Sequence, residues 1–371
     1  MASPADVSRR SLPPSATGVN PLRLVGAVVA LIALGGVLWA GFLFLRDSKA
    51  PQLVITLIAI VWGVGGVAAL YFTVNGVVEE LPEKPRRVLQ PFVFVGPAVA
   101  ILAWFLFIPA LRTLYLSFLN SDSTTFVGLD NYIAVFSERS MLEAFRNNLI
   151  WMIIGTAACV GFGLLIAILA DRSRFETVAK ALIFLPMAIS FVGAGVIWRF
   201  IYAYAPSNDP QIGLLNALVI AFGGSPQAWI TLLQPWNNLF LIVVLIWMQT
   251  GFAVVIFSAA IKAIPEDTLE AARVDGASEI QIFFSIIIPA IQGTIITVTT
   301  TIVIFTLKIF DVVIVMTGGQ YGTHVIATQF YRQFFTNRNF GYGSAIAIVL
   351  LIAVIPVMIY NLRQFNKQEA F

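Results

Sequence analysis

Charged residues are scarce in this chain. Only 11% of its 371 residues are Asp, Glu, Lys or Arg, whereas 59% are hydrophobic. Soluble domains contain roughly 25% charged residues, so this composition excludes a soluble globular protein. The mean hydropathy of +0.89 indicates a polytopic membrane protein instead.

Cysteine and histidine are nearly absent, with one residue of each. The single cysteine, Cys159, excludes a disulfide within the chain, and its apolar neighbours favour a packing role. No metal is predicted, because a zinc site needs several His or Cys ligands. His324 lies in a glycine-rich stretch and is interpreted as a loop-stabilising or solvent-facing residue in preference to a proton relay.

A glycine-rich phosphate loop followed by Lys and Ser or Thr is also missing from the sequence. Such a loop holds the phosphates of ATP in many ATPases. We therefore expect no ATP hydrolysis by the chain itself, no cofactor and no catalytic residue.

Eight stretches are long and apolar enough to cross a membrane. The hydrocarbon core is ~30 Å thick and needs about 20 helical residues for each span. Helices are expected because lipid leaves unpaired backbone groups unsatisfied, and no stretch alternates like a barrel strand. The fold class is therefore all-α, with predicted spans at residues 24–45, 53–77, 89–111, 149–170, 181–203, 239–261, 284–307 and 342–362.

Basic residues predict the orientation of these spans. An even number of spans puts both termini on one side, and a cytoplasmic placement puts thirteen of the 22 Lys and Arg residues inside. The bias is sharpest in loops 80–90 and 171–180. Both termini and the loop 262–283 are therefore predicted to be cytoplasmic. The net charge of +3 follows from this topology and indicates no nucleic-acid partner.

Composition also divides the chain along its length. The polar residues 1–20 predict a disordered cytoplasmic tail. A charged, proline-broken linker at 79–87 separates the two leading spans from the rest. We predict a two-helix extension with its linker over 21–88, rich in glycines suited to close helix packing, and a transmembrane core over 89–371.

Two long segments between spans are predicted to lie on the outer side. Residues 112–148 mix turn formers with aromatic residues and predict a small packed element. Residues 206–236 contain apolar runs too short to span, which predicts short helices over the outer mouth, where a substrate-delivering partner would dock. An interfacial role is an equal alternative for Trp229 and Trp236.

The charged segment 265–289 interrupts the apolar chain and predicts a helix, a glycine elbow and a second helix. Pro265 suits the first helical position, and the acidic residues that follow complement the helix dipole. Gly276 suits the left-handed conformation after a first helix that runs to Asp275. Ser278 and Gln281 have the spacing of a capping box for the second helix.

The same segment resembles the integral membrane permease subunits of binding-protein-dependent ABC importers. Their hallmark is Glu-Ala-Ala, three residues, Gly, nine residues and Ile-x-Leu-Pro, with Ile288 here in place of the usual Leu. The resemblance implies a type I ABC importer permease core, and a coupling helix that inserts into a cleft of an ATPase subunit. The implied coupling residues are Glu270, Ala271, Ala272, Asp275, Gly276 and Pro289.

Further short sequence segments resemble those of the maltose-permease-like, carbohydrate branch of this family. They lie at residues 126–132, 310–319 and 340–345. The resemblance implies sugar import, with an α-glucoside, trehalose, sucrose or glucosylglycerol type of substrate, across a bacterial inner membrane. It also implies a second permease subunit in a heterodimer, two cytoplasmic ABC ATPase subunits that hydrolyse the ATP, and an extracytoplasmic solute-binding protein.

Polar and aromatic residues in the spans that flank the loop are the candidates for the substrate path, since sugars need both hydrogen bonds and aromatic stacking. The alternative for the threonines is a hydrogen bond to their own helix. An ion pair near the outer end of the span is the simplest interpretation of Lys308 and Asp311. The candidates are Trp247, Gln249, Thr250, Thr297, Thr301, Phe305, Lys308 and Asp311.

Two other functions stay open at this level. A permease for another solute, such as glycerol phosphate, would favour several cationic residues near these spans, where only Lys308 occurs. A secondary transporter without an ATPase would show ionisable groups within spans or paired broken helices, and the sequence shows neither clearly.

Overall fold

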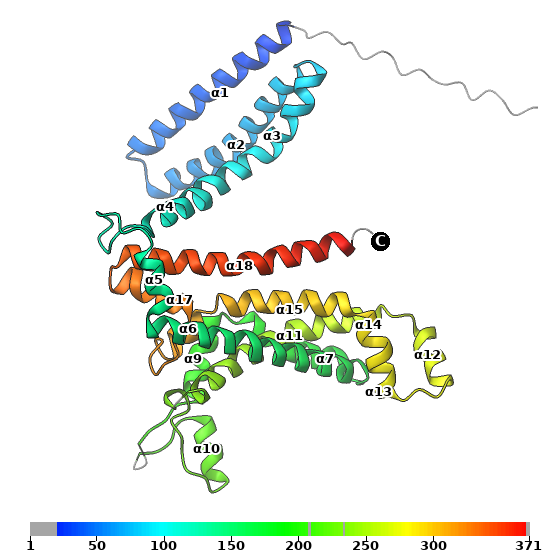
Figure 1. The fold of residues 1–371 in the computed structure, drawn as a ribbon. Coiled ribbons are helices and arrows are strands. Elements are labelled where there is room, and N and C mark those ends of the chain that lie inside the picture. The colour runs from blue at the N-terminus through cyan, green and yellow to red at the C-terminus, as the bar shows by residue number, and fades with distance from the viewer. Residues whose placement is uncertain (1–20, 207–208, 233, 369–371) are drawn as a thin grey trace, which may run out of the picture. The chain divides into compact units, whose positions relative to one another are not determined.

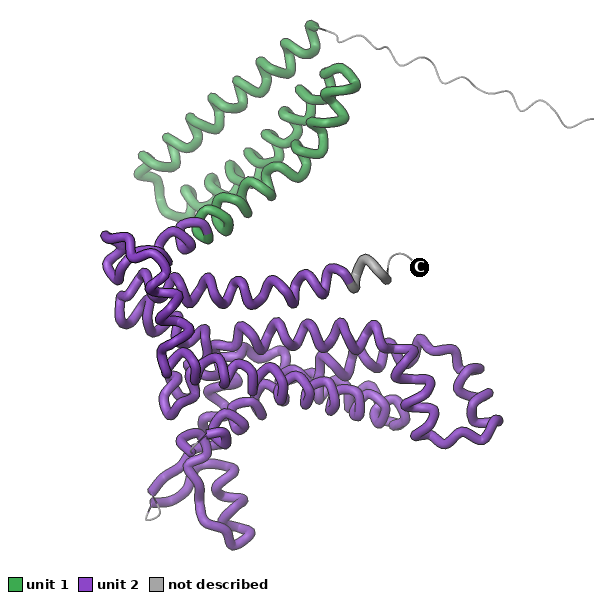
Figure 2. The backbone as a smooth tube through the Cα atoms, viewed as in Figure 1, with its two compact units in different colours: residues 1–110 green, residues 111–371 purple. Residues whose placement is uncertain are grey.

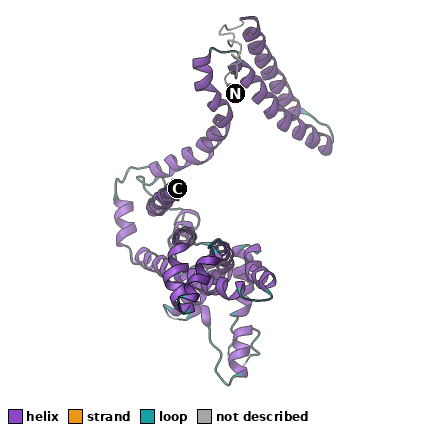
Figure 3. Ribbon diagram, turned by 90° about the vertical axis from the view of Figure 1, so that its right-hand side faces the viewer, coloured by secondary structure: helices purple, strands orange, loops and turns teal. Residues whose placement is uncertain are grey.

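The computed structural model describes residues 21–206, 209–232 and 234–368 (Figure 1). Over these residues the chain is helical, and the nearest approach to a strand is an isolated antiparallel bridge between Leu119 and Phe126 (Figure 3). This confirms the all-α fold class. The predicted tail 1–20 lies outside the described residues.

The chain forms two compact units, residues 1–110 and residues 111–371 (Figure 2). The first contains α1 (Pro21–Asp47), α2 (Gln52–Glu79), α3 (Glu83–Leu102) and the π-helical turn η1 (Ala103–Phe107). The third predicted span therefore belongs to the first unit. The functional division at residue 88 stays a prediction.

Close contacts between α1 and α2 occur at two of the glycines of the first unit. A Cβ on Gly41 would lie 2.1 Å from the indole nitrogen of Trp62, and one on Gly66 would lie 2.7 Å from Leu38. These two glycines therefore allow the helices to pack directly on each other.

The second unit holds the remaining elements, with α4 (Ile108–Leu116) crossing the division between the units. They are α5 (Asp130–Ser137), α6 (Arg139–Ile150), η2 (Trp151–Gly155), α7 (Thr156–Asp171), α8 (Glu176–Phe184), η3 (Leu185–Ala188), α9 (Phe191–Ile201), α10 (Leu214–Ala221), η4 (Trp229–Thr231), α11 (Trp236–Lys262), α12 (Glu266–Val274), α13 (Glu279–Ile282), η5 (Phe283–Ile287), α14 (Ile288–Ala290), α15 (Gln292–Leu307), α16 (Asp311–Met316), α17 (Ile326–Tyr331), η6 (Arg332–Thr336) and α18 (Phe340–Gln368).

α11 is the central helix of the second unit. It packs against both α7 and α15, and its membrane-length window is 56% buried inside the protein, more than that of any other described continuous span. Gly163 of α7 permits this contact, because a Cβ there would lie 2.4 Å from the Cβ of Ala253. The group α7, α11 and α15 carries α12 at one end, called here the loop end, and α17 at the other, called the far end (Figure 1).

Two of the predicted spans are broken. The pair Glu176–Ala188 and Phe191–Ile201 is bent by 101°, and the pair Glu279–Ala290 and Gln292–Leu307 by 72°. Pro186 and Pro289 lie next to the two breaks, where proline removes a helical hydrogen bond. The view that the sequence contains no clear pair of broken helices is therefore wrong.

With each bent pair counted as one span, the described residues contain up to eight spans, six of them continuous. This agrees with the predicted number. A neighbouring helix packs closely against α8, ahead of the first break. A Cβ on Gly251 of α11 would lie 2.4 Å from the carbonyl oxygen of Ile183 in α8.

The short helices predicted between residues 206 and 236 are present as α10 and η4. Asn216 holds this segment together by donating hydrogen bonds of 3.0 Å to the carbonyls of Ala203 and Gln227. Its side-chain oxygen accepts a 3.0 Å hydrogen bond from the indole of Trp229. Trp229 is thus part of the folded segment, whereas Trp236 is exposed.

Candidate functional site: the two-helix loop and its anchors

The first helix of the loop is α12. It begins at Glu266, with Pro265 at the N-cap and not at the predicted first helical position, and ends at Val274, one residue before the predicted end. The carboxylates of Glu266 and Asp267 lie in its first turn, and Arg273 lies in its last, so charges of both signs complement the helix dipole.

Gly276 forms the predicted elbow. Its φ is +82°, which a residue with a Cβ adopts only with strain. The amide of Gly276 donates to the carbonyl of Arg273 over 3.0 Å, and that of Ala277 donates to Ala272 over 3.0 Å. These two bonds form a Schellman motif, which closes the end of α12.

The second helix begins with the predicted capping box. The amide of Gln281 donates to the hydroxyl of Ser278 over 3.3 Å, and the amide of Ser278 donates to the side chain of Gln281 over 2.8 Å. α13 continues through η5 into α14, where Pro289 precedes the bend to α15. The last residue of the motif is therefore also part of a broken span, a role that the motif itself did not predict.

Exposure divides the residues of α12 into two faces. Leu269 and Ala272 are half-buried and pack toward the core of the second unit. Glu270 and Ala271 are exposed, and Val274 is 87% exposed. The face available to a partner is therefore acidic and apolar, and Val274 belongs to it although the motif does not include it.

Glu279 anchors the elbow to a distant helix. Its carboxylate forms an ion pair with Arg172, directly after α7, and a second one with Arg273 of α12 over 3.1 Å. One acidic side chain therefore holds together both helices of the loop and the end of a transmembrane helix. The sequence interpretation missed Glu279, because its partner Arg172 is 107 residues away.

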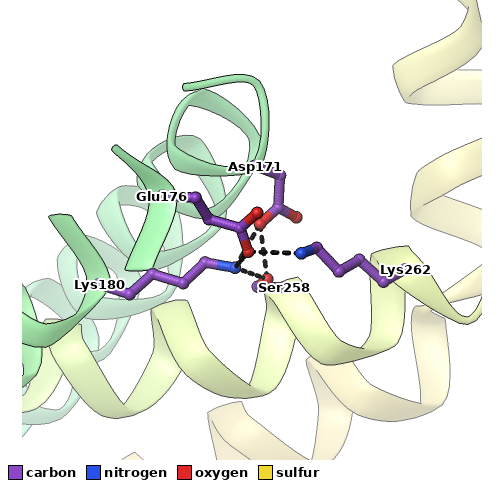
Figure 4. A network of polar contacts seen from close by, with 5 residues as sticks. All are labelled: Asp171, Glu176, Lys180, Ser258 and Lys262. Atoms are coloured by element: carbon purple, nitrogen blue, oxygen red, sulfur yellow. Dashed lines mark hydrogen bonds and ion pairs between the residues drawn. The ribbon is translucent and has the colours of Figure 1, made fainter. Parts of the chain in front are cut away.

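A second polar network lies at the same end of the helices (Figure 4). Lys180 of α8 is 2.5 Å from carboxylate oxygens of both Asp171 and Glu176. Ser258 of α11 donates to Asp171 over 2.6 Å, and Lys262 pairs with Glu176. The network fastens the first half of the broken span, α8, to the ends of α7 and α11.

The substrate-path candidates on α11 are largely covered by the chain itself. Gln249 and Thr250 are buried, and the Thr250 hydroxyl donates to the carbonyl of Ile246 over 2.6 Å. The side-chain oxygen of Gln249 has no hydrogen-bond partner among the described residues. Trp247 is half-buried, with its ring 5.8 Å from that of Trp198.

On α15 the threonines bond to their own helix. Thr297 donates to Gly293 over 3.0 Å and Thr301 donates to Thr297 over 2.8 Å, as in the alternative interpretation. Phe305 is 42% exposed. Their contact with a substrate stays a prediction.

The predicted pairing of Lys308 with Asp311 is wrong. α15 ends at Leu307, so Lys308 is its C-cap and Asp311 begins the separate helix α16. None of the ion pairs formed by described residues joins the two. Lys308 is exposed and Asp311 is half-buried.

Four buried asparagines, which the sequence interpretation missed, lie at the far end, and three of them bond directly to the loop 317–326. Asn147 of α6 donates to the carbonyls of Gly322 and His324, each over 2.7 Å. Asn237 of α11 donates to Tyr321 over 2.6 Å. Asn148 accepts a hydrogen bond from the amide of Ile326, and Asn238 donates to the side chains of Asn147 and Asn237.

His324 belongs to this loop. It lies 3.2 Å from the Thr328 hydroxyl and 3.3 Å from Arg332, and its ring lies against Gly319. Burial, and to a smaller extent the positive charge of Arg332, lowers the pKa of His324 to about 4. The imidazole is therefore neutral and stabilises the loop.

Comparison with known proteins identifies relatives of this chain. The family described as binding-protein-dependent transport system inner membrane component matches residues 159–367. The osmoprotective compounds uptake permease protein GgtC of Synechocystis is 52% identical, over 74% of this chain and 99% of its own. The alpha-glucoside transport system permease protein AglF of Rhizobium meliloti is 44% identical, over 86% of this chain and 98% of its own.

A solved structure shares the fold. A chain of a bacterial ABC transporter involved in the import of the acidic polysaccharide alginate superimposes with a TM-score of 0.65 at 20% identity. The match covers 78% of the present chain and 98% of that one.

Proposed function

The chain belongs to the family of binding-protein-dependent transport system inner membrane components, and we propose that it is the permease subunit of an ATP-driven importer for an α-glucoside-type sugar or glycoside. The single observation that carries the coupling role is the exposed face of α12, held by the Gly276 elbow and the Glu279 anchor. Two relatives support the substrate class: AglF is named as an alpha-glucoside permease, and GgtC as a permease for osmoprotective compounds.

In the proposed mechanism, α12 enters a cleft of a cytoplasmic ATPase subunit. Glu270 and Val274 contact that subunit from the exposed face, while Leu269 and Ala272 hold the helix to the permease. When the ATPases close on ATP, the loop moves with them. Glu279 transmits this movement to α7, and the chain 279–290 transmits it to the bend before α15.

The bends in the two broken spans are the points at which this movement could change the relative position of helices. α8 is fastened to α7 and α11 at the loop end, whereas α9, beyond the 101° bend, packs against α16. Both halves contact α11, but α8 also contacts α7, whereas α9 packs mainly against α16. We propose that a shift between the two halves opens and closes the substrate path. Broken helices also occur in secondary transporters, but the family assignment and the exposed coupling helix favour the ATP-driven mechanism.

The assembly follows from the same proposal. We propose a second permease subunit in a heterodimer, two ATPase subunits that hydrolyse the ATP, and an extracytoplasmic binding protein that delivers the sugar. We propose that both termini and the loop end lie in the cytoplasm, which the distribution of basic residues supports.

The proposal is tested by purifying the assembled transporter with its binding protein and measuring ATP hydrolysis. We expect stimulation by one or more of sucrose, trehalose, maltose and glucosylglycerol. Stimulation by glycerol 3-phosphate alone would identify the other solute class, to which the 29% identical permease protein UgpA of Agrobacterium fabrum belongs by name. Uptake that continues without any ATPase would overturn the coupling mechanism.

A further inference from the structure

The helix α12 is joined to the rest of the second unit by two short connections. α11 ends at Lys262 and α12 begins at Glu266, so residues 262–265 form what we call the first stem. α12 ends at Val274 and α13 begins at Glu279, so residues 275–279 form the second stem. Each stem contains a charged side chain, Lys262 or Glu279, that forms an ion pair outside the loop.

The partners of these two side chains belong to one turn. Arg172, the partner of Glu279, directly follows α7, and Glu176, the partner of Lys262, is the first residue of α8. We call residues 172–176 the α7–α8 turn. One end of the turn is therefore paired with the second stem, and the other end with the first stem, as the contact between Glu176 and Lys262 in Figure 4 shows.

Hydrogen bonds within the α7–α8 turn fix its shape. The backbone amide of Ser173 donates to the carbonyl of Ala170 over 3.0 Å, and that of Glu176 donates to Ser173 over 3.3 Å. The Ser173 hydroxyl accepts a 3.1 Å hydrogen bond from the amide of Phe175. Lys180 lies 2.5 Å from the Glu176 carboxylate and holds it in place. The distance between the two charged ends of the turn is therefore fixed as well.

Either stem pair can be broken without leaving a carboxylate unpaired. Glu279 also pairs with Arg273 over 3.1 Å, and Glu176 keeps the lysine of its own helix. The side chains of Arg172 and Lys262 are 57% and 52% exposed. Exposed ion pairs contribute little to folding stability. The main effect of the two pairs is therefore on the position of the stems.

We propose that the α7–α8 turn fixes the orientation of α12 for binding to the ATPase subunit, with Arg172, Glu176 and Lys262 as positioning residues. This inference rests on the proposed coupling role of α12. A loop whose two stems are already fixed loses less conformational freedom on binding, so its partner binds more tightly. The turn acts only while both ends are paired, because a stem released at either end is free to move.

This dependence on both ends gives a specific test. The ATPase subunits are titrated onto the permease heterodimer in nanodiscs, with binding protein and sugar present, and ATP hydrolysis reports their affinity. We expect Arg172→Gln and Lys262→Gln each to weaken the affinity about threefold, the order of the cost of fixing one group on binding. The double variant should also lose about threefold, whereas independent contributions would multiply to about ninefold. The unfolding temperature should not change.

Matched variants separate positioning from general electrostatic attraction. Arg174→Gln removes an exposed cation of the same turn that forms no ion pair with a described residue, and should leave the affinity unchanged. Arg139→Gln breaks an exposed ion pair elsewhere in the second unit and should also have no effect. Glu270→Ala, on the exposed face of α12, tests the docking role itself and should weaken binding.

Several outcomes would overturn the proposal. Parental affinity in both single variants, together with weakened binding by Glu270→Ala, would refute the role of the turn and leave the docking role intact. Parental affinity in all three variants would refute the docking role. A multiplied loss in the double variant, or a loss in Arg174→Gln, would show that the cations act separately on the ATPase. Lower unfolding temperatures with parental affinity would show that the pairs only stabilise the fold.

Discussion

The backbone amide of Ile326 donates a hydrogen bond of 2.8 Å to the side-chain oxygen of Asn148, although 178 positions separate the two residues. The amide nitrogen of the same side chain donates to the carbonyl of Leu307 over 3.1 Å. Asn148 is only 3% exposed. One buried side chain therefore joins α6 to the end of α15 and to the start of α17.

Asn148→Ala should destabilise the far end of the second unit. It leaves the amide of Ile326 and the carbonyl of Leu307 without these partners, and each unsatisfied buried group costs about 1–3 kcal/mol. We expect a lower thermal unfolding temperature of the purified protein. Asn337→Ala, which removes an exposed 2.9 Å bond to Gln333, is the control, and an equal effect of both variants would contradict the assignment.

Glu270→Ala should weaken binding of the ATPase subunit without changing membrane insertion. Glu270 is exposed on α12, and loss of a hydrogen bond to a charged group costs about 1.5–3 kcal/mol, or about tenfold or more in affinity. Co-purification of the ATPase and sugar uptake measure the effect.

The control for this variant is Glu83→Ala, which removes an exposed carboxylate paired with Arg87 in the first unit. It should leave co-purification at the parental level. Sugar uptake by Glu270→Ala at the parental rate would refute the docking role of α12.

Acid should destabilise the protein through His324. Its pKa is lowered from 6.5 to about 4 in the folded protein, so between these values the unfolded chain binds more protons. The stabilisation is fully present above about pH 6.5 and is lost as the pH falls toward 4. We expect His324→Gln to reduce this slope in unfolding temperature measured from pH 7 to pH 4. An unchanged dependence of unfolding temperature on pH would show that His324, the chain's single histidine, does not cause it.

Lys180→Met should destabilise the loop end because it leaves Asp171 without its cation. The Asp171 side chain is 12% exposed, and an unpaired, largely buried group of this kind costs about 1–3 kcal/mol or more. Arg87→Met, in a pair that is 79% and 61% exposed, should cost only about 0–1 kcal/mol. Adding Asp171→Asn to Lys180→Met should recover part of the lost stability, and a further loss would contradict the proposed pairing.

Local patterns predicted the loop well because its geometry depends on neighbouring residues. The capping box of Ser278 and Gln281 and the left-handed Gly276 both require only a few adjacent residues, and the structure contains both. The ion pair of Arg172 with Glu279 could not be predicted in the same way. Each residue is an ordinary charge near a helix end, and only the packing of α7 beside α13 brings them together.

The asparagines and the threonines show the same difference between long-range contacts, which the sequence did not predict, and local contacts, which it did. Asn147 and Asn148 end the predicted outer segment 112–148, yet their partners are backbone groups more than 150 positions away. Thr297 and Thr301 bond within one helix, which is the alternative that the sequence had left open for them.

Sequence alone determined the membrane class, the number of spans and the coupling motif, because apolar length and local capping are properties of contiguous residues. Only the tertiary structure decided which prolines break a span. Pro91, Pro97 and Pro356 lie inside continuous helices, whereas Pro186 and Pro289 lie at bends of 101° and 72°. The physical reason is that a break within a membrane needs neighbours that cover the freed backbone. Gly251 of α11 packs against the backbone of Ile183 in α8, ahead of the first bend, and no local pattern shows its approach.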